Sequence, residues 1–290
     1  MARCNDRAND KGVSESIGFL LIFTIVIMGI SLVTLYGYPL LLKQQVSADE
    51  KIMEKNMIVL QNDFKSLAYK TVPFKDTSLK IGGGTLTVYN SSSSAPSSTL
   101  QINNGGGTAS YLPPPDTEFT PGELRYESVS AQTDISLQNG AVVLRPRINQ
   151  GTTHGSVMLA EPRWFYDRNT NTMVINLINI TSDTIMAKEG IGTVRMSLVG
   201  QPSFSEEYIS PGEEIQFKYT PDSTQDYSVA WDNYIMKTFD IPSYVSVTNS
   251  GTPGSGAPVT YTVKNLVKPL GIPPDMHLVI KIFETQIISI

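Results

Sequence analysis

The chain has 290 residues, of which 40% are hydrophobic and 17% are charged, and its formal net charge is −5. This acidic balance and the lack of any Lys/Arg cluster argue against nucleic acid as a partner, because nucleic-acid binding needs a basic face. The only cysteine, Cys4, lies near the N-terminus, so no disulfide can form within the rest of the chain.

The longest apolar stretch runs from Ile17 to Leu42 without a charged residue. As a helix it would be about 39 Å long, which exceeds the hydrocarbon core of a bilayer. Lipid offers no partners to loose backbone groups, so only a helix can cross it alone. The sequence therefore predicts a cytoplasmic leader at 1–12 and one transmembrane helix at 13–42, with membrane lipid as a partner. Pro39 is expected to bend or loosen the outer end of this helix.

Three interpretations of this segment remain open. In a cleavable secretory signal, Val46-Ser47-Ala48 would supply the small residues of a cleavage site, but the apolar run is far longer than such signals have. In a plain signal anchor, the helix simply stays uncleaved. In the third interpretation, Lys11-Gly12 followed by Val13-Ser14-Glu15 and the apolar run resembles the class III signal of archaeal type IV pilin-like proteins.

This resemblance implies a processing site at Lys11, Gly12 and Val13. A prepilin-type peptidase would cut after Gly12 on the cytoplasmic side, remove Cys4 with the leader, and leave the helix for assembly with other pilin-like subunits. Bacterial type IV pilins carry a glutamate at the fifth mature position, which meets a neighbour's terminal amine, whereas Glu15 would be the third residue. Glu15 therefore has two candidate roles, in that pairing or in stabilising the helix N-terminus through the macrodipole.

Residues 43–72 are predicted to continue outward as an amphipathic helix. From Met53 onward its apolar residues recur at alternating steps of four and three, which places them on one helical face that should pack on the protein's own β-domain. The apolar positions are Val46, Met53, Met57, Leu60, Phe64 and Leu67. Val72-Pro73 should end the helix, because the residue before proline avoids helical backbone angles.

Residues 74–290 are predicted to form a β-rich extracellular domain, so the fold class is α+β with a mainly antiparallel β-sandwich, either one enlarged sandwich or two stacked ones. Gly82-Gly83-Gly84 indicates a hairpin or a bulge, and 90–122 an irregular, partly mobile loop around a short strand at Thr99–Ile102. Residues 141–180 resemble the outer domains of single-anchor archaeal proteins of the pilin-like class. Further strands are expected at Leu124–Val129, Ile135–Leu137, Ala141–Leu144, Met158–Ala160, Arg163–Tyr166, Met173–Ile180, Gly192–Val199, Ile215–Tyr219, Tyr227–Trp231, Tyr244–Thr248, Val259–Lys264 and His277–Thr285, with one short helix at Asp232–Thr238.

No pattern in the chain indicates an enzyme, a catalytic residue, a cofactor or a metal site. The two histidines, His154 and His277, stand without a nucleophile motif, and no zinc-ligand spacing occurs. Asp167-Arg168-Asn169-Thr170-Asn171 begins like a calcium loop, but the required Gly and Glu are missing, so a hairpin turn explains it better. The run Trp164-Phe165-Tyr166 fits either a core strand or a sugar-binding platform.

Asn90 and Asn179 stand in glycosylation sequons, which fits a domain outside the cell. With its N-terminus in the cytoplasm, the protein is predicted to be a structural subunit, a pilin or minor pilin, of an archaeal surface filament whose core is built from the membrane helices. The alternative is a non-polymerising, membrane-anchored β-sandwich that binds something at the cell surface. An anchored hydrolase is the third hypothesis.

Overall fold

The computed structural model describes residues 7–70, 72–91, 97–147, 155–222, 224–268 and 270–290, with the side chains of 7–15 outside that description. The chain divides into two compact units, Met1–Ala48 and Asp49–Ile290. The long helix belongs partly to each unit, so the predicted 43–72 helix is grouped mainly with the β-domain.

The first unit is helical throughout its described part. It contains α1 (Arg7–Leu32), the π-helical turn η1 (Val33–Gly37) and the start of α2 (Tyr38–Tyr69). The π-turn ends two residues before Pro39, whose nitrogen has no hydrogen to donate to the carbonyl of Leu35. The wider turn is a way to accommodate that missing bond. The predicted loosening of the helix next to Pro39 is therefore present.

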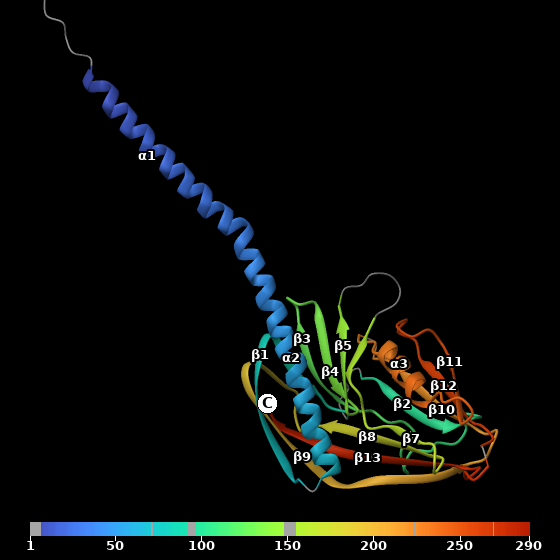
Figure 1. Ribbon diagram of the computed structural model, residues 1–290. Coiled ribbons are helices and arrows are strands. Elements are labelled where there is room, and N and C mark those ends of the chain that lie inside the picture. The colour runs from blue at the N-terminus through green and yellow to red at the C-terminus, as the bar shows by residue number, and fades with distance from the viewer. Residues whose placement is uncertain (1–6, 71, 92–96, 148–154, 223, 269) are drawn as a thin grey trace, which may run out of the picture. The chain divides into compact units, whose positions relative to one another are not determined.

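The described residues of the second unit form the remainder of α2, thirteen strands and one further helix (Figure 1). Its elements are β1 (Phe74–Tyr89), β2 (Thr99–Asn104), β3 (Glu123–Ser128), β4 (Thr133–Gln138), β5 (Ala141–Pro146), β6 (Val157–Ala160), β7 (Phe165–Asp167), β8 (Thr172–Thr181), β9 (Met186–Ile209), β10 (Glu214–Thr220), α3 (Ser228–Phe239), β11 (Val245–Ser250), β12 (Val259–Asn265) and β13 (Met276–Ser289). One sheet has the order β6-β5-β4-β3-β1-β9-β13-β8-β7, and the other has the order β11-β12-β10-β2.

The large sheet curls around α2. The end of β8 returns toward the other half of the sheet, where Ile178 N donates to Asn139 Oδ1 at 3.0 Å and Ile180 N to Pro121 O at 2.7 Å. The concave face of the sheet encloses the stripe of α2 that the sequence predicted, and all five of its residues from Met53 to Leu67 are buried. Helix α2 is thus the core element of this layer.

The opposite face of the large sheet packs against the small sheet and α3, which lie together on that side in Figure 1. This second core is rich in aromatic side chains, including Trp164, Phe217, Trp231 and Phe239. The domain is therefore layered as helix, large sheet, and small sheet with helix. The α+β class is confirmed, with two open sheets in which only β8 and β13 pair in parallel among the strands of the described residues.

Three expectations need correction or refinement. The predicted strand Tyr227–Trp231 is wrong: it forms the first turn of α3, where Trp231 N donates to Tyr227 O at 3.2 Å. Strand β9 is much longer than the expected Gly192–Val199, because it pairs with β1 over its first half and with β13 over its second. The sequence left a hairpin or a bulge open at glycines 82–84. They lie in a bulge within the single strand β1.

The expected loop 90–122 is only partly irregular over its described residues. Leu100 and Phe119 exchange two backbone hydrogen bonds of 2.8 Å, and Tyr111 N donates to Ile102 O at 2.8 Å. Leu112 and Phe119 are buried in the aromatic core. This segment therefore folds back onto β2 and covers the outer edge of the small sheet.

Candidate functional site

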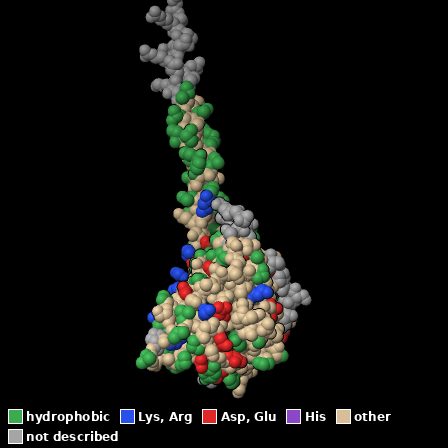
Figure 2. Space-filling model, turned by 90° about the vertical axis from the view of Figure 1, so that its right-hand side faces the viewer, with side chains coloured by type: hydrophobic (Ala, Val, Ile, Leu, Met, Phe, Trp, Pro, Cys, Tyr) green, Lys and Arg blue, Asp and Glu red, His purple; other side chains and the backbone are tan. Residues whose placement is uncertain are grey.

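The apolar helix of the first unit is the candidate functional element. Ser16–Tyr69 is one helix, long and apolar enough at its N-terminal end to cross a membrane, and it is the single such helix in the described part of the chain. Its large apolar side chains from Ile17 to Leu42 are exposed, and Figure 2 shows them covering much of the helix on the side in view. An apolar surface of this extent needs a non-aqueous environment. The helix is therefore a candidate single-pass membrane anchor.

The two threonines within the apolar run bond to the preceding helical turn. Thr24 Oγ1 donates to Leu20 O at 2.7 Å, and Thr34 Oγ1 donates to Ile30 O at 2.9 Å. These bonds to the preceding turn leave no hydroxyl hydrogen in need of water. Both threonine hydroxyls can thus lie in hydrocarbon with a hydrogen-bond partner.

The predicted processing residues Lys11, Gly12 and Val13, together with Glu15, lie within α1. Their backbone is helical, and their side chains are outside the described residues, as is Cys4 with its whole environment. The structure therefore places these residues on one helix with the apolar run and gives no contact for them.

The two sequon asparagines lie in different settings. Asn90 follows β1, and its Nδ2 donates to Ser182 O at 2.5 Å. Asn179 lies within β8, between β13 and β7 in the sheet order, and its Oδ1 is buried. A glycan is attached most readily in a surface loop, so Asn90 is the better placed of the two.

The structure brings together a buried ionic cluster that the sequence did not suggest. Arg125 on β3 pairs with Glu123 and, at 3.3 Å, with Asp222 in the loop after β10, so it ties the two sheets together. Asp134 on β4 accepts from Arg145 and Arg147 at 3.2 and 2.5 Å. The only available signal was the charge on alternate residues, at Glu123, Arg125 and Glu127 of β3 and at Arg145 and Arg147, which normally marks a solvated face.

The pKa values around this cluster reflect both burial and the neighbouring groups. Burial acts to lower the pKa of Arg125, but the neighbouring Tyr227, Tyr89 and Asp222 outweigh it and the net pKa is raised. Burial also raises the pKa of Tyr227 well above its usual value. The buried arginines of the cluster are thus paired with buried carboxylates. These ion pairs have the arrangement expected of a structural link between the two sheets.

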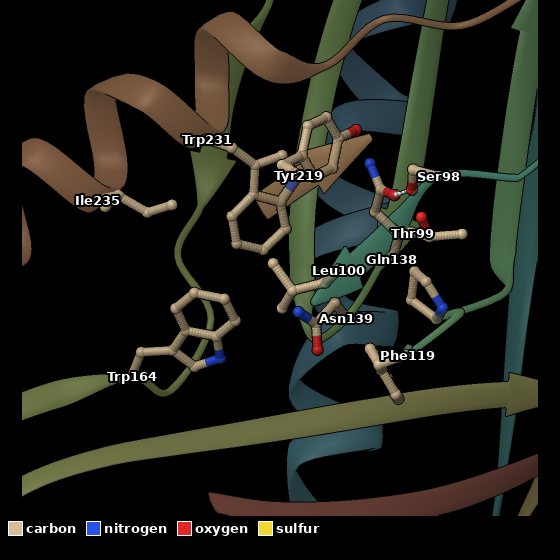
Figure 3. A pocket seen from close by; sticks show the side chains of 11 residues that line it. Ser98, Thr99, Leu100, Phe119, Gln138, Asn139, Trp164, Tyr219, Trp231 and Ile235 are labelled. Carbon is tan, nitrogen blue, oxygen red and sulfur yellow. Dashed lines mark hydrogen bonds between the residues drawn. The ribbon is translucent and has the colours of Figure 1, made fainter. Parts of the chain in front are cut away.

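The aromatic residues considered for a sugar platform belong to the core. Trp164 is buried, its ring centroid lies 5.2 Å from that of Trp231, and its Nε1 donates to Asn176 O at 2.8 Å. Figure 3 shows both tryptophans facing a small pocket together with Leu100 and Tyr219. The cavity measures about 10 Å³, room for at most one water. Trp164 therefore acts in packing.

The remaining candidates also take structural positions. Asp167 accepts hydrogen bonds of 3.0 Å from Asn169 N and Thr170 Oγ1 in the turn between β7 and β8, which is the predicted hairpin turn. His277 stacks on Tyr208 with ring centroids 4.8 Å apart, and its Nε2 lies 3.5 Å from Glu206. His154 lies outside the described residues.

Comparison with known proteins identifies the family. Residues 11–253 match the model of a family of unknown function, DUF7289, so the match includes both the apolar helix and most of the β-domain. No curated protein and no solved structure gives a significant match. Because the match covers more than half of the sequence, the chain belongs to the DUF7289 family.

Proposed function

We propose that this protein is a pilin-like structural subunit of an archaeal cell-surface filament. The observation that carries the proposal is the helix Ser16–Tyr69, whose first part exposes apolar side chains and whose last part is the core of a curled β-sheet. Such a helix serves both as a membrane anchor before assembly and as the assembly core afterwards. The Lys11-Gly12-Val13 sequence at its start supplies the processing site.

In this proposal a prepilin-type peptidase cuts after Gly12 and the retained helix packs with other pilin-like subunits. The leader is cytoplasmic, and Asp49–Ile290 lies outside the cell. The role is structural, without catalytic residues or cofactors, and the formal charge of −5 speaks against nucleic acid as a partner. A non-polymerising anchored surface protein would need the same helix, so processing and assembly discriminate between the two functions.

The test compares Gly12→Val with Gly18→Val. Both replace a glycine of the same helix by the same residue, and an added Cβ at Gly18 meets no atom within 4 Å. Bulk beside the cut bond should block the peptidase, so Gly12→Val should retain Met1 and stay in the membrane as unassembled subunits. The Gly18→Val protein should begin at Val13 like the wild type.

N-terminal sequencing of the protein from membranes reads the processing, and electron microscopy of the cell surface reads the filaments. A wild-type protein that retains its leader would contradict the pilin-like role and favour the anchored surface protein. Processing that proceeds normally in Gly12→Val would contradict the assigned cleavage site.

A further inference from the structure

The small pocket in the aromatic core is lined by buried polar atoms that the chain itself leaves without a hydrogen bond. Gln138, Tyr219 and Trp231 line this pocket and are 1%, 4% and 3% exposed. Among the described residues, Gln138 Nε2, the Tyr219 hydroxyl and Trp231 Nε1 have no hydrogen-bond partner within the chain. Because a buried polar group without a partner is costly, a bound molecule that satisfies these three atoms is expected.

The three side chains come from three different elements of the domain. Gln138 ends β4 of the large sheet, Tyr219 lies on β10 of the small sheet, and Trp231 lies on α3. Figure 3 shows the Tyr219 hydroxyl and the amide nitrogen of Gln138 pointing toward one another, with the indole nitrogen of Trp231 on the edge that faces Tyr219. The pocket thus gathers polar atoms from both sheets and from the helix between which it lies.

The chemistry of these atoms limits what can bind. Ser98 Oγ donates to Gln138 Oε1 at 2.9 Å, which orients the amide so that Nε2 faces away from Ser98. An amide nitrogen and an indole nitrogen only donate, whereas a tyrosine hydroxyl both donates and accepts. The described residues that line the pocket include no charged side chain, so nothing there would compensate a buried ion. The occupant must therefore be neutral and able to accept hydrogen bonds.

The size of the pocket narrows the choice further. Its volume is about 10 Å³, at the lower limit of what holds a single water. A water accepts two hydrogen bonds and donates two, and buried waters in proteins typically make about three. The two nitrogen donors and the hydroxyl supply that number, and no larger neutral molecule fits.

We propose that one structural water occupies this pocket, accepts hydrogen bonds from Gln138 Nε2 and Trp231 Nε1, and donates one to the Tyr219 oxygen. The water links β4, β10 and α3, so it is a polar bridge across the aromatic core. All of its partners lie within the unit Asp49–Ile290. The bridge is therefore independent of the membrane anchor, of processing and of assembly.

The chain contains two tryptophans, which allows a comparison within one protein. Trp164 Nε1 donates directly to Asn176 O at 2.8 Å, so its indole hydrogen faces a carbonyl and not a water. The full chain with isotope-labelled tryptophan, in detergent micelles, is studied by water-selective NMR. Trp231 should show a nuclear Overhauser effect from a long-lived water, and Trp164 should show none. Comparison of laboratory-frame and rotating-frame transfer separates this effect from proton exchange, and Trp231→Phe assigns the two signals.

A pair of variants tests the third partner. Tyr219→Phe removes the hydroxyl that faces the pocket, whereas Tyr261→Phe removes the hydroxyl of another buried tyrosine of the small sheet that does not line it. The water signal at Trp231 should be lost in Tyr219→Phe and kept in Tyr261→Phe. An unchanged Trp164 signal shows that a variant is folded, and the comparison of the two tryptophans in the wild type needs no variant to fold.

Two results would overturn the bridge. The absence of a water signal at Trp231 in the wild type would show that the pocket is dry. A signal at Trp231 that persists at full strength in folded Tyr219→Phe would show that the water is held by other groups and does not join the two sheets.

Discussion

At the scale of single residues, the glycines 82–84 allow close approach of three elements. An added Cβ at Gly82 would lie 2.5 Å from Asp49 Oδ1 on α2, and one at Gly84 would overlap Glu127 O on β3 and lie 2.7 Å from the Tyr126 ring. Tyr126 and Ser128 donate to the carbonyls of Gly82 and Gly83, which holds the bulge against β3. The triplet is therefore a packing feature of β1.

Gly84→Ala is expected to lower the free energy of unfolding of the domain by about 1–3 kcal/mol, the range of overpacked sites, because the opposing atom is a backbone oxygen that cannot move freely. Gly155→Ala serves as the control, since a Cβ there meets no atom within 4 Å. Urea unfolding of both variants gives the comparison. Equal stability of the two would contradict the close contact at Gly84.

Also at this scale, Gln61 is a polar residue within the apolar stripe of α2. It is 2% exposed, and its Nε2 donates to Gly140 O at 2.7 Å and to Glu161 O at 2.9 Å. Neighbouring Lys65 also donates to Glu161 O, at 2.8 Å, and burial lowers the pKa of its amine. These bonds attach α2 to the β4–β5 turn and to the segment after β6.

At the scale of elements, α2 has two unlike faces over residues 49–69. One face is buried by the curled sheet, with Phe64 among its largest side chains, while Val59 on the other face is 48% exposed. The free energy of this packing comes from removing the apolar stripe from water. The apolar stripe of α2 and the concave face of the sheet thus each depend on the other for burial from water.

Phe64→Ala should cost about 3–5 kcal/mol of unfolding free energy, as for other buried phenylalanines, because it opens a cavity between α2 and the sheet. Val59→Ala on the exposed face should change it by no more than about 0.5 kcal/mol. Chemical unfolding followed by circular dichroism measures both. A comparable loss in the two variants would mean that the exposed face of α2 is also buried.

At the scale of the whole molecule, the boundary of the foldable domain follows from the same packing. The compact unit begins at Asp49, not at residue 74 where the strands begin. A chain that starts at residue 74 lacks the helix that covers Leu79, Leu86, Ile135 and Met196. These side chains would then form an exposed apolar patch.

A fragment of residues 49–290 should therefore fold as a soluble β-rich monomer, whereas residues 74–290 should aggregate or bind a hydrophobic dye. Circular dichroism and size-exclusion chromatography of the two fragments provide the measurement. Adding the peptide 49–70 to the shorter fragment should restore its solubility. A well-folded 74–290 monomer would show that α2 is dispensable for the domain.

The sequence by itself determined the elements whose signal is local. The apolar run and the stripe from Met53 to Leu67 both follow from the spacing of apolar residues along the chain. Each of these patterns lies within one continuous stretch of chain, so no distant contact was needed to interpret it.

Only the tertiary structure decided features that depend on distant partners. Tyr227–Trp231 has the aromatic composition of a strand, but packing of Trp231 and Tyr234 on Trp164 favours the helix. The parallel pairing of β8 with β13 and the buried Arg125 cluster join segments about a hundred residues apart. Charged residues at alternate positions of a strand suggest a solvent-exposed face. The whole fold decides whether a second layer buries them in ion pairs, so the sequence alone could not reveal it.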